Sequence, residues 1–257
     1  MKRYASFIVG LLLIFFSYSK SFASEIYEIT VYHFIDTQQE VALDTYLQTA
    51  YLPALHRNGK QNIGVFKPVA NDTAADKKIY VITPFKSLDE TQLLQRALAK
   101  DQIYIEAGKQ YLTASYKTPP YARMEKIMLS AFELAPKMNL PKLTSAKKDR
   151  IYELRSYESP TENYYINKVK MFNAGGEIDI FSKLGFNAVF YGEVIAGSRM
   201  PNLMYLTSFE NMAERDAHWK SFTDDADVKK LFALDEYKNN VSKADIILMH
   251  ATSYSDY

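Results

Sequence analysis

Eight short segments rich in β-branched and aromatic residues are spaced along the chain, and this pattern predicts eight β-strands. The first four cover residues 25–34, 63–69, 78–85 and about 123–132. The other four cover about residues 150–157, 187–194, 203–209 and 245–251. Segments with helical spacing lie between several of these strands, so the pattern favours an α+β fold.

One predicted helix follows the first strand. Its apolar residues recur at spacings of three and four and therefore share one helical face: Leu43, Leu47, Ala50, Ala54 and Leu55. Asn58 and Gly59 supply a stop signal at its end. Ser87, with Glu90 three residues later, predicts a capping box that opens a second helix.

The chain resembles itself at a shift of 125 residues. Ile26-Tyr27-Glu28-Ile29 recurs as Ile151-Tyr152-Glu153-Leu154, and residues 62–69 resemble residues 187–194. Each half thus has the order strand, helix, strand, strand, helix, strand, which is the ferredoxin-like βαββαβ arrangement. Its four-stranded antiparallel sheet leaves one face uncovered. We therefore expect two tandem repeats whose sheets pack against each other into a barrel within one chain.

The repeat and the N-terminal pattern divide the chain into four parts. Residues 1–23 read as a signal peptide cleaved after Ala23, because Lys2 and Arg3 precede an apolar run that is too short to span a bilayer. An uncleaved N-terminal anchor is the alternative. The first ferredoxin-like domain covers 24–134, a linker with Pro136 and Pro141 covers 135–149, and the second domain covers 150–257. The predicted location is periplasmic or secreted.

Composition narrows the class of protein. The chain has 257 residues, 47% of them hydrophobic, and 31 basic residues balance 30 acidic ones. A globular protein without the basic excess of a nucleic-acid binder fits these values. The sequence contains no cysteine, which excludes disulfides, a cysteine nucleophile and zinc-cysteine clusters. Aromatic residues are dominated by 20 tyrosines and 15 phenylalanines, with one tryptophan, Trp219.

Several segments closely resemble motifs of the NIPSNAP family. In the second half they are Ile151-Tyr152-Glu153-Leu154-Arg155-Ser156-Tyr157, Met171-Phe172-Asn173-Ala174-Gly175-Gly176-Glu177, Gly192-Glu193, Arg199-Met200-Pro201-Asn202-Leu203 and Arg215-Asp216-Ala217-His218-Trp219. In the first half they are Tyr51-Leu52-Pro53-Ala54-Leu55 and Pro119-Pro120-Tyr121-Ala122-Arg123-Met124-Glu125. The chain looks like the exported bacterial members with two tandem NIPSNAP domains. The resemblance implies a dimeric α/β-barrel fold and no settled activity.

The first predicted strand of the second half carries the most charged of these motifs. Strand alternation places Glu153, Arg155 and Tyr157 on one face, and Tyr152 and Leu154 on the other. If the helices cover the Tyr152 face, the charged residues point into the space between the two sheets. They then form either a polar ligand site, with Glu153 as base and Arg155 as anion clamp, or a structural ion pair.

The candidate ligand-binding residues come from this strand, from its counterpart in the first half and from the family-like motifs. They are Glu28, Tyr32, Glu153, Arg155, Tyr157, Glu177, Arg199 and Asn202. No catalytic residue is assigned, because no nucleophile, base and orienting group can be assembled from the sequence.

Two further motifs have structural and functional interpretations. Gly175-Gly176 interrupts a helical segment and predicts a helix break with Glu177 capping the resumed helix; a ligand contact at the break is the alternative. Asp224-Asp225-Ala226-Asp227 lacks the glycine and distal glutamate of a calcium loop and predicts a helix N-cap.

Histidine offers weak candidates for a metal or haem. His33, His56 and His250 are conceivable axial haem ligands by analogy with haem-binding proteins of this architecture. They lie in different elements, no two of the four histidines have metal-ligand spacing, and none stands in a haem motif. We therefore expect no metal and no cofactor.

Two functions remain open at this point. The first is an exported binding or assembly module that holds a small organic ligand or a partner protein. The alternative is a cofactor-independent monooxygenase-like or isomerase-like enzyme acting on an aromatic or lipid-like substrate, which rests on fold analogy. We expect no nucleic-acid partner and no transmembrane anchor after signal cleavage. Free outer strand edges favour a homodimer.

Overall fold

The computed structural model describes residues 24–257, and the predicted signal peptide lies outside this part of the chain. The first half contains strands β1 (Ile26–Phe34), β2 (Gly64–Pro68), β3 (Lys77–Phe85) and β4 (Arg123–Ala131). Its helices are α1 (Thr37–Tyr46), α2 (Leu52–Arg57), α3 (Leu88–Leu98), α4 (Gln102–Ala107) and α5 (Lys109–Leu112), with a π-helical turn η1 (Leu47–Tyr51) between α1 and α2.

The second half contains strands β5 (Ile151–Glu158), β6 (Asn187–Ala196), β7 (Asn202–Phe209) and β8 (Lys243–Ala251). Its helices are α6 (Glu162–Phe172), α7 (Glu177–Lys183), α8 (Met212–Asp224) and α9 (Ala226–Ala233), with short 3₁₀ turns η2 (Lys147–Asp149) and η3 (Asp235–Tyr237). None of the helices in residues 24–257 is long and apolar enough to cross a membrane.

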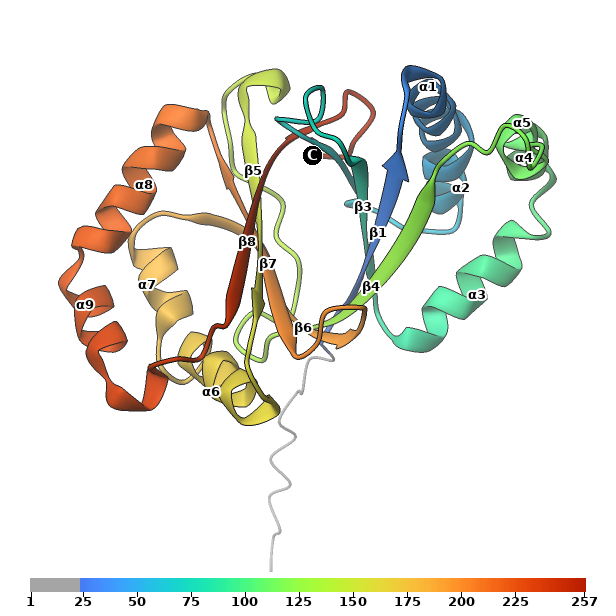
Figure 1. Ribbon diagram of the computed structural model, residues 1–257. Helices are drawn as coiled ribbons and strands as arrows, with labels where there is room; N and C mark the ends of the chain where they lie inside the picture. The colour runs from blue at the N-terminus through green and yellow to red at the C-terminus, as the bar shows by residue number, and fades with distance from the viewer. Residues whose placement is uncertain (1–23) are drawn as a thin grey trace, which may run out of the picture.

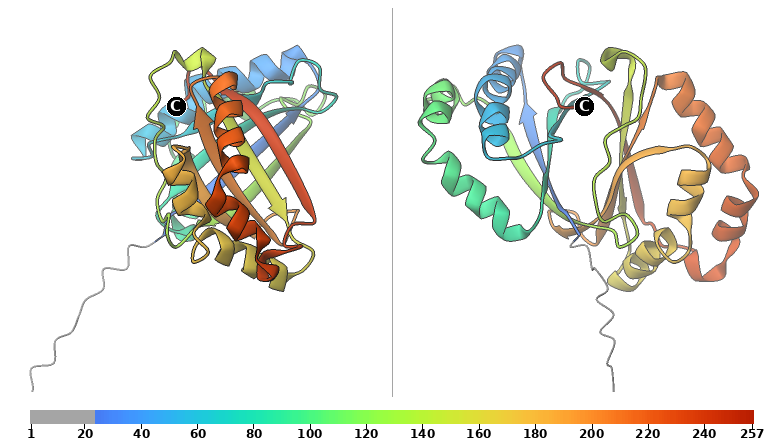
Figure 2. Two further views of the ribbon diagram at one scale, coloured as in Figure 1. Left: turned by 90° about the vertical axis from the view of Figure 1, so that its left-hand side faces the viewer. Right: turned by 180° about the vertical axis from the view of Figure 1, so that it is seen from behind.

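The eight strands form one closed antiparallel barrel in the order β1-β3-β2-β8-β5-β7-β6-β4. Within the first half the order is β4-β1-β3-β2, and within the second it is β8-β5-β7-β6. The helices lie on the outside of both sheets, as the front and rear views show (Figures 1 and 2). The predicted barrel is therefore confirmed, and the corresponding strands of the two halves occupy corresponding places in it.

Two short seams close the barrel. Strand β2 pairs with β8 from Phe66↔Ala251 to Pro68↔Met249, and β4 pairs with β6 from Met128↔Ala196 to Ala131↔Gly192. These seams join the outer strands of the two sheets, so along them no free edge is available to a second copy. The argument from free edges for a homodimer is therefore wrong there, and the homodimer itself stays a prediction.

Large apolar side chains fill the barrel interior. Tyr27 and Ile29 from β1 meet Tyr152 and Leu154 from β5, and all four have no exposed surface. The helices consequently cover the opposite face of each sheet. The sequence-based assumption that they cover the Tyr152 face is wrong, because the closed interior takes up the bulky apolar residues and leaves the charged ones facing the helices.

The capping and stop residues in the sequence predicted several helix ends. The predicted apolar face of the first helix is buried, and the helix ends with Asn58 as its C-cap and Gly59 at a φ of 74°. Asp225 caps α9 by accepting hydrogen bonds from the backbone N–H of Asp227 and Val228. Ser87 stands at the N-cap of α3 but makes no side-chain cap bond, and Glu90 accepts from the N–H of Lys86 instead.

Candidate functional site

The candidate residues fall into three separate places. Glu153, Arg155, Tyr157 and Glu177 gather between the sheet and the helices of the second half. Glu28 and Tyr32 lie in the corresponding space of the first half. Arg199 and Asn202 line a pocket at the barrel end where β1 and β5 finish. The structure therefore brings four of them together and keeps the others apart.

Glu153 is the centre of the second-half group and has no exposed surface. Its Oε1 accepts from Arg155 Nε at 2.5 Å. Its Oε2 accepts from Arg215 Nε at 2.6 Å and from the Trp219 indole N–H at 2.9 Å. Both oxygens are thus engaged by cations or by the indole, which is the condition under which a buried carboxylate is tolerated.

Arg215 and Trp219 were not among the predicted site residues. They stand four positions apart on α8, so both side chains lie on the same face of that helix and reach the sheet together. Trp219 also lies flat over Arg155, with 3.5 Å between the guanidinium carbon and the ring centroid. The Arg215–Trp219 spacing beside a strand glutamate was the signal that could have identified them.

Tyrosine hydroxyls extend this network into the sheet. Arg155 Nη1 donates to the Tyr157 hydroxyl at 2.9 Å, and that hydroxyl lies 2.9 Å from the Tyr205 hydroxyl. Burial alone would lower the pKa of Arg155, but the adjacent Tyr205, Tyr157 and Glu153 outweigh it and raise the pKa above its ordinary value. The guanidinium is therefore a fixed charge at any physiological pH.

Glu177 belongs to a second buried ion pair beside the first. Its carboxylate accepts from Lys168 Nζ at 2.8 Å, and both side chains are under 5% exposed. Gly176, at a φ of 86°, breaks the helix between α6 and α7 and lets Glu177 turn inward. The predicted helix break is confirmed, whereas Glu177 pairs with Lys168 and makes no cap bond.

The first half has a different arrangement at the equivalent positions. Glu28 accepts from Lys126 Nζ at 2.7 Å and from the Thr30 hydroxyl at 3.2 Å. Tyr32 lies with other tyrosines, including Tyr46 and Tyr111, whose rings stack 3.6 Å apart. Burial raises the pKa of the Tyr32 hydroxyl, so these phenols stay neutral.

The four histidines are engaged locally. His56 contacts the Asp256 carboxylate, while His218 and His250 each contact a backbone carbonyl oxygen. His33 lies between two carboxylates. Across residues 24–257, no three His, Asp or Glu side chains gather into a group that could hold a metal ion.

Four well-formed pockets lie on the described residues, and Glu153, Arg155 and Glu177 line none of these four. The largest, about 850 Å³, is a groove in the first half beside α1, and its walls are mainly exposed polar side chains. A pocket of about 450 Å³ lies between α7 and α9. Glu153 and Glu177 are buried and paired with cations of the protein itself, which favours the structural ion-pair interpretation.

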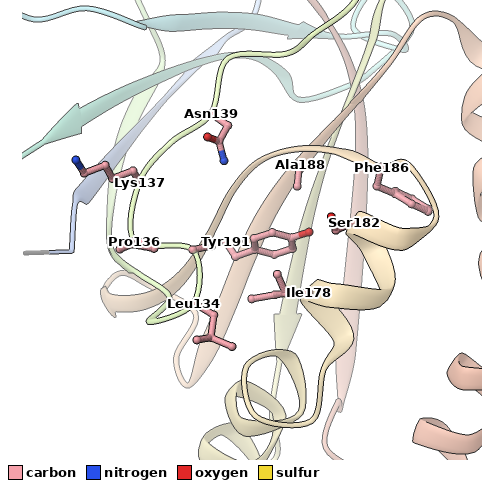
Figure 3. Close-up of a pocket in the computed structure, with 10 residues that line it drawn as sticks. Leu134, Pro136, Lys137, Asn139, Ile178, Ser182, Phe186, Ala188 and Tyr191 are labelled. Atoms are coloured by element: carbon pink, nitrogen blue, oxygen red, sulfur yellow. The ribbon is translucent and has the colours of Figure 1, made fainter. Parts of the chain in front are cut away.

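A pocket of about 460 Å³ lies where residues 134–139 pass over α7 and β6, and we call it the linker pocket (Figure 3). Its apolar walls come from Leu134, Pro136, Ile178 and Phe186. Its polar groups come from Asn139, Ser182 and Tyr191, and from Lys137, whose amine points away from the other three in Figure 3. Figure 3 shows the Tyr191 hydroxyl pointing toward Ser182, so hydroxyl groups converge in an otherwise apolar recess.

The Tyr191 ring is fixed by neighbouring aromatic rings. Its ring stacks against Phe132 and Tyr205, with centroids 6.2 and 5.7 Å apart. Burial, with a smaller contribution from Glu177, raises the pKa of its hydroxyl. Tyr191 is therefore a rigid, neutral hydrogen-bonding group, and it was not among the predicted site residues.

A closed eight-stranded antiparallel barrel, with the helices of both halves outside it, defines a dimeric α/β-barrel architecture built by a single chain. Residues 152–256 match the family model described as NIPSNAP. This match covers most of the second half of the chain and agrees with the family indicated by the motifs around Glu153 and Trp219.

Solved structures share the fold over most of the chain. A protein named putative monooxygenase from Lactobacillus acidophilus NCFM has a TM-score of 0.57 and 12% identity, covering 89% of this chain and 94% of its own. One of the same name from Fusobacterium nucleatum has a TM-score of 0.55 and 9% identity, covering 90% and 93%. At these identities the likeness extends to the fold alone. No curated protein matches the sequence significantly.

Proposed function

We propose that this protein is an exported binding module whose ligand is a small organic molecule held in the linker pocket. The observation that carries the proposal is the pocket itself, about 460 Å³ with apolar walls and a few convergent polar groups. Sites for small molecules typically have this size and this composition. An aromatic or otherwise flat apolar body with one hydrogen-bonding group fits it best.

The polar groups indicate how such a ligand is oriented. Tyr191 and Ser182 each offer a hydroxyl, which donates or accepts, and Asn139 offers an amide. The ring edges of Phe186 and Tyr191 supply aromatic contact area. A neutral or weakly polar group of the ligand therefore meets the hydroxyls while its apolar body lies along Ile178 and Leu134.

The alternative, a cofactor-independent monooxygenase-like or isomerase-like enzyme, has less support. It needs a free carboxylate or cation facing a substrate cavity. Glu153 is saturated by Arg155, Arg215 and Trp219, and Glu177 is paired with Lys168. The names of the structural neighbours alone do not supply a catalytic group.

We further propose that the first half is a diverged second copy of the same repeat. The shift of 125 residues and the equal strand order of the two halves support this. The proposed boundaries are 24–134 and 150–257, with 135–149 as the linker. We also propose cleavage after Ala23 and a periplasmic or secreted location, which N-terminal sequencing of the protein recovered from its native compartment tests directly.

Fluorescence of the single tryptophan gives a test of the linker pocket. Trp219 packs on Phe186 with ring centroids 4.9 Å apart, and Phe186 lines the pocket. Anilinonaphthalene sulfonate, an aromatic probe, should bind saturably and change the emission of Trp219. Mass spectrometry of the natively purified protein should then identify the physiological occupant.

A filling variant and a matched control complete the experiment. Ala188→Leu places three more carbon atoms in the pocket and should weaken probe binding at least tenfold. Ala217→Leu makes the same change on the exposed side of α8 and should leave binding unaltered. Equal binding by the Ala188→Leu and Ala217→Leu proteins, both folded by circular dichroism, would overturn the proposal.

A further inference from the structure

A second, separate pocket of about 160 Å³ opens at the barrel end where β1 and β5 finish, and we call it the mouth pocket. It lies beneath the loop that joins β6 to β7. Its apolar lining comes from one side chain on each of five strands: Val31, Ile127, Val194, Met204 and Ile247. Mouths of β-barrels are frequent ligand sites. The linker pocket and the mouth pocket share no lining residue.

The basic groups at the mouth are already neutralised. Arg199 lies 2.5 Å from the Asp245 carboxylate and also pairs with Glu158. Lys78 lies 2.9 Å from Asp76. Each cation thus has an acidic partner at contact distance, so the mouth pocket offers no free positive charge for an anionic ligand.

One acidic group at the mouth has no such partner. Glu125 lines the pocket, and its only charged contact among the described residues is His33 Nε2 at 3.3 Å. That nitrogen is buried and makes no well-aligned hydrogen bond there. Arg199 is shared by two carboxylates, Glu158 and Asp245, so with Glu125 and Asp76 the carboxylates at the mouth outnumber the lysine and arginine side chains that pair with them. The mouth pocket therefore presents an acidic surface beside apolar walls.

Two polar groups complete the lining. The Tyr80 side chain is buried and lines the pocket, yet its hydroxyl makes no hydrogen bond to any described residue. Asn202 is also buried, and its amide donates to the Ser156 hydroxyl at 2.9 Å. The Tyr80 hydroxyl is therefore available to a ligand in the pocket as a donor or an acceptor.

We propose that the mouth pocket binds a small organic cation, namely a primary ammonium with a short aliphatic chain. The ammonium group pairs with Glu125 and donates to the Tyr80 hydroxyl, and the chain lies against Val31 and Ile127. The volume supports this size, because about 30 Å³ per water-sized group allows roughly five non-hydrogen atoms. n-Butylammonium has that number and serves as the probe.

Isothermal titration calorimetry with matched probes tests the proposal. n-Butylammonium should bind saturably, with a dissociation constant of about 1 mM for a ligand of this size. Neutral n-butanol and anionic butyrate have nearly the same shape and should bind at least tenfold more weakly. Binding of all three probes with equal affinity would overturn the assignment, and so would the absence of n-butylammonium binding.

Variants locate the site. Glu125→Gln should weaken n-butylammonium binding at least tenfold, and Tyr80→Phe about threefold, whereas Glu106→Gln, a change of exposed charge on α4, should have no effect. The filling variant Ala188→Leu should also leave n-butylammonium binding unchanged. A failure of the linker-pocket proposal can therefore be distinguished from a failure of the mouth-pocket proposal. Unaltered binding in the Glu125→Gln protein would place the cation elsewhere and refute the proposal.

Discussion

The Trp219 ring lies over the Arg155 guanidinium at 3.5 Å, while its indole N–H reaches past it to Glu153. One side chain from α8 therefore makes a cation–π contact and a charge-assisted hydrogen bond to two neighbouring charges of β5. This contact fixes the helix to the sheet at the centre of the second half.

Replacing Trp219 by phenylalanine keeps an aromatic face over Arg155 but removes the indole donor. Glu153 Oε2 then retains only Arg215, and a buried hydrogen bond to a charged group is lost. We expect the free energy of unfolding to fall by about 2 kcal/mol. Urea denaturation followed by circular dichroism measures it, and a change below about 0.5 kcal/mol would contradict the role of the indole N–H.

Glu28 and Glu153, the third residues of β1 and β5, should differ in their effect on stability. Glu153→Gln leaves Arg155 and Arg215 without their buried carboxylate and should cost about 3 kcal/mol or more. Glu28→Gln removes the partner of the more exposed Lys126 and should cost about 1 kcal/mol. Chemical denaturation of both proteins gives the comparison. Equal losses would mean that burial of the cations does not govern the energetics.

The Lys168–Glu177 pair predicts a pH-dependent variant. Burial raises the pKa of Glu177, and Lys168, followed by Arg155, opposes the rise. A folded-state pKa above the unfolded one means that the native state holds the proton more tightly, so stability falls as the pH rises from the ordinary carboxyl range through the raised value. In Lys168→Met the folded pKa of Glu177 rises further, and the loss of stability should be larger at pH 8 than at pH 5.

The double variant Lys168→Met/Glu177→Gln provides the control for that measurement. It removes the buried charge as well as its partner, so it should recover most of the stability and lose the pH dependence. Denaturation midpoints at pH 5 and pH 8 give the answer. A loss that is the same at both pH values would exclude Glu177 as the titrating group.

Substitutions at Gly176 measure how much the backbone conformation at the helix break contributes to stability. A Cβ atom at this position would meet nothing within 4 Å, so only the φ of 86° opposes a side chain. Gly176→Ala should cost about 1–2 kcal/mol, the usual penalty for a left-handed L-residue. Gly176→Asn should cost less, because asparagine tolerates this region. Thermal denaturation of the two variants should show this order, and the reverse order would contradict the backbone explanation.

Much of the fold could be predicted from the sequence because its signals are local. The alternation of apolar residues located all eight strands, and Gly59, Gly176 and Asp225 marked helix ends through backbone geometry and capping. The expected βαββαβ order of each half then predicted its strand order, which the barrel has.

The orientation of the candidate site could not be predicted in the same way. Alternation separates Tyr152 from Glu153, but both are completely buried, so the pattern does not say which face meets the helices. The deciding partners, Arg215 and Trp219, come from helix α8, which is distant from β5 in sequence. Only once this helix is packed do its side chains make the helix side the favourable place for Glu153.

Closure of the barrel by one chain also removes a constraint that symmetry would impose. In a barrel made of two identical chains, every substitution appears twice, so a residue that suits one sheet has to suit its copy. Here Thr30 and Arg155 occupy the same register position in the two halves, one beside Glu28 and the other beneath Trp219. A single chain can therefore place different residues at matching positions of its two sheets, which a symmetric assembly of identical chains does not permit.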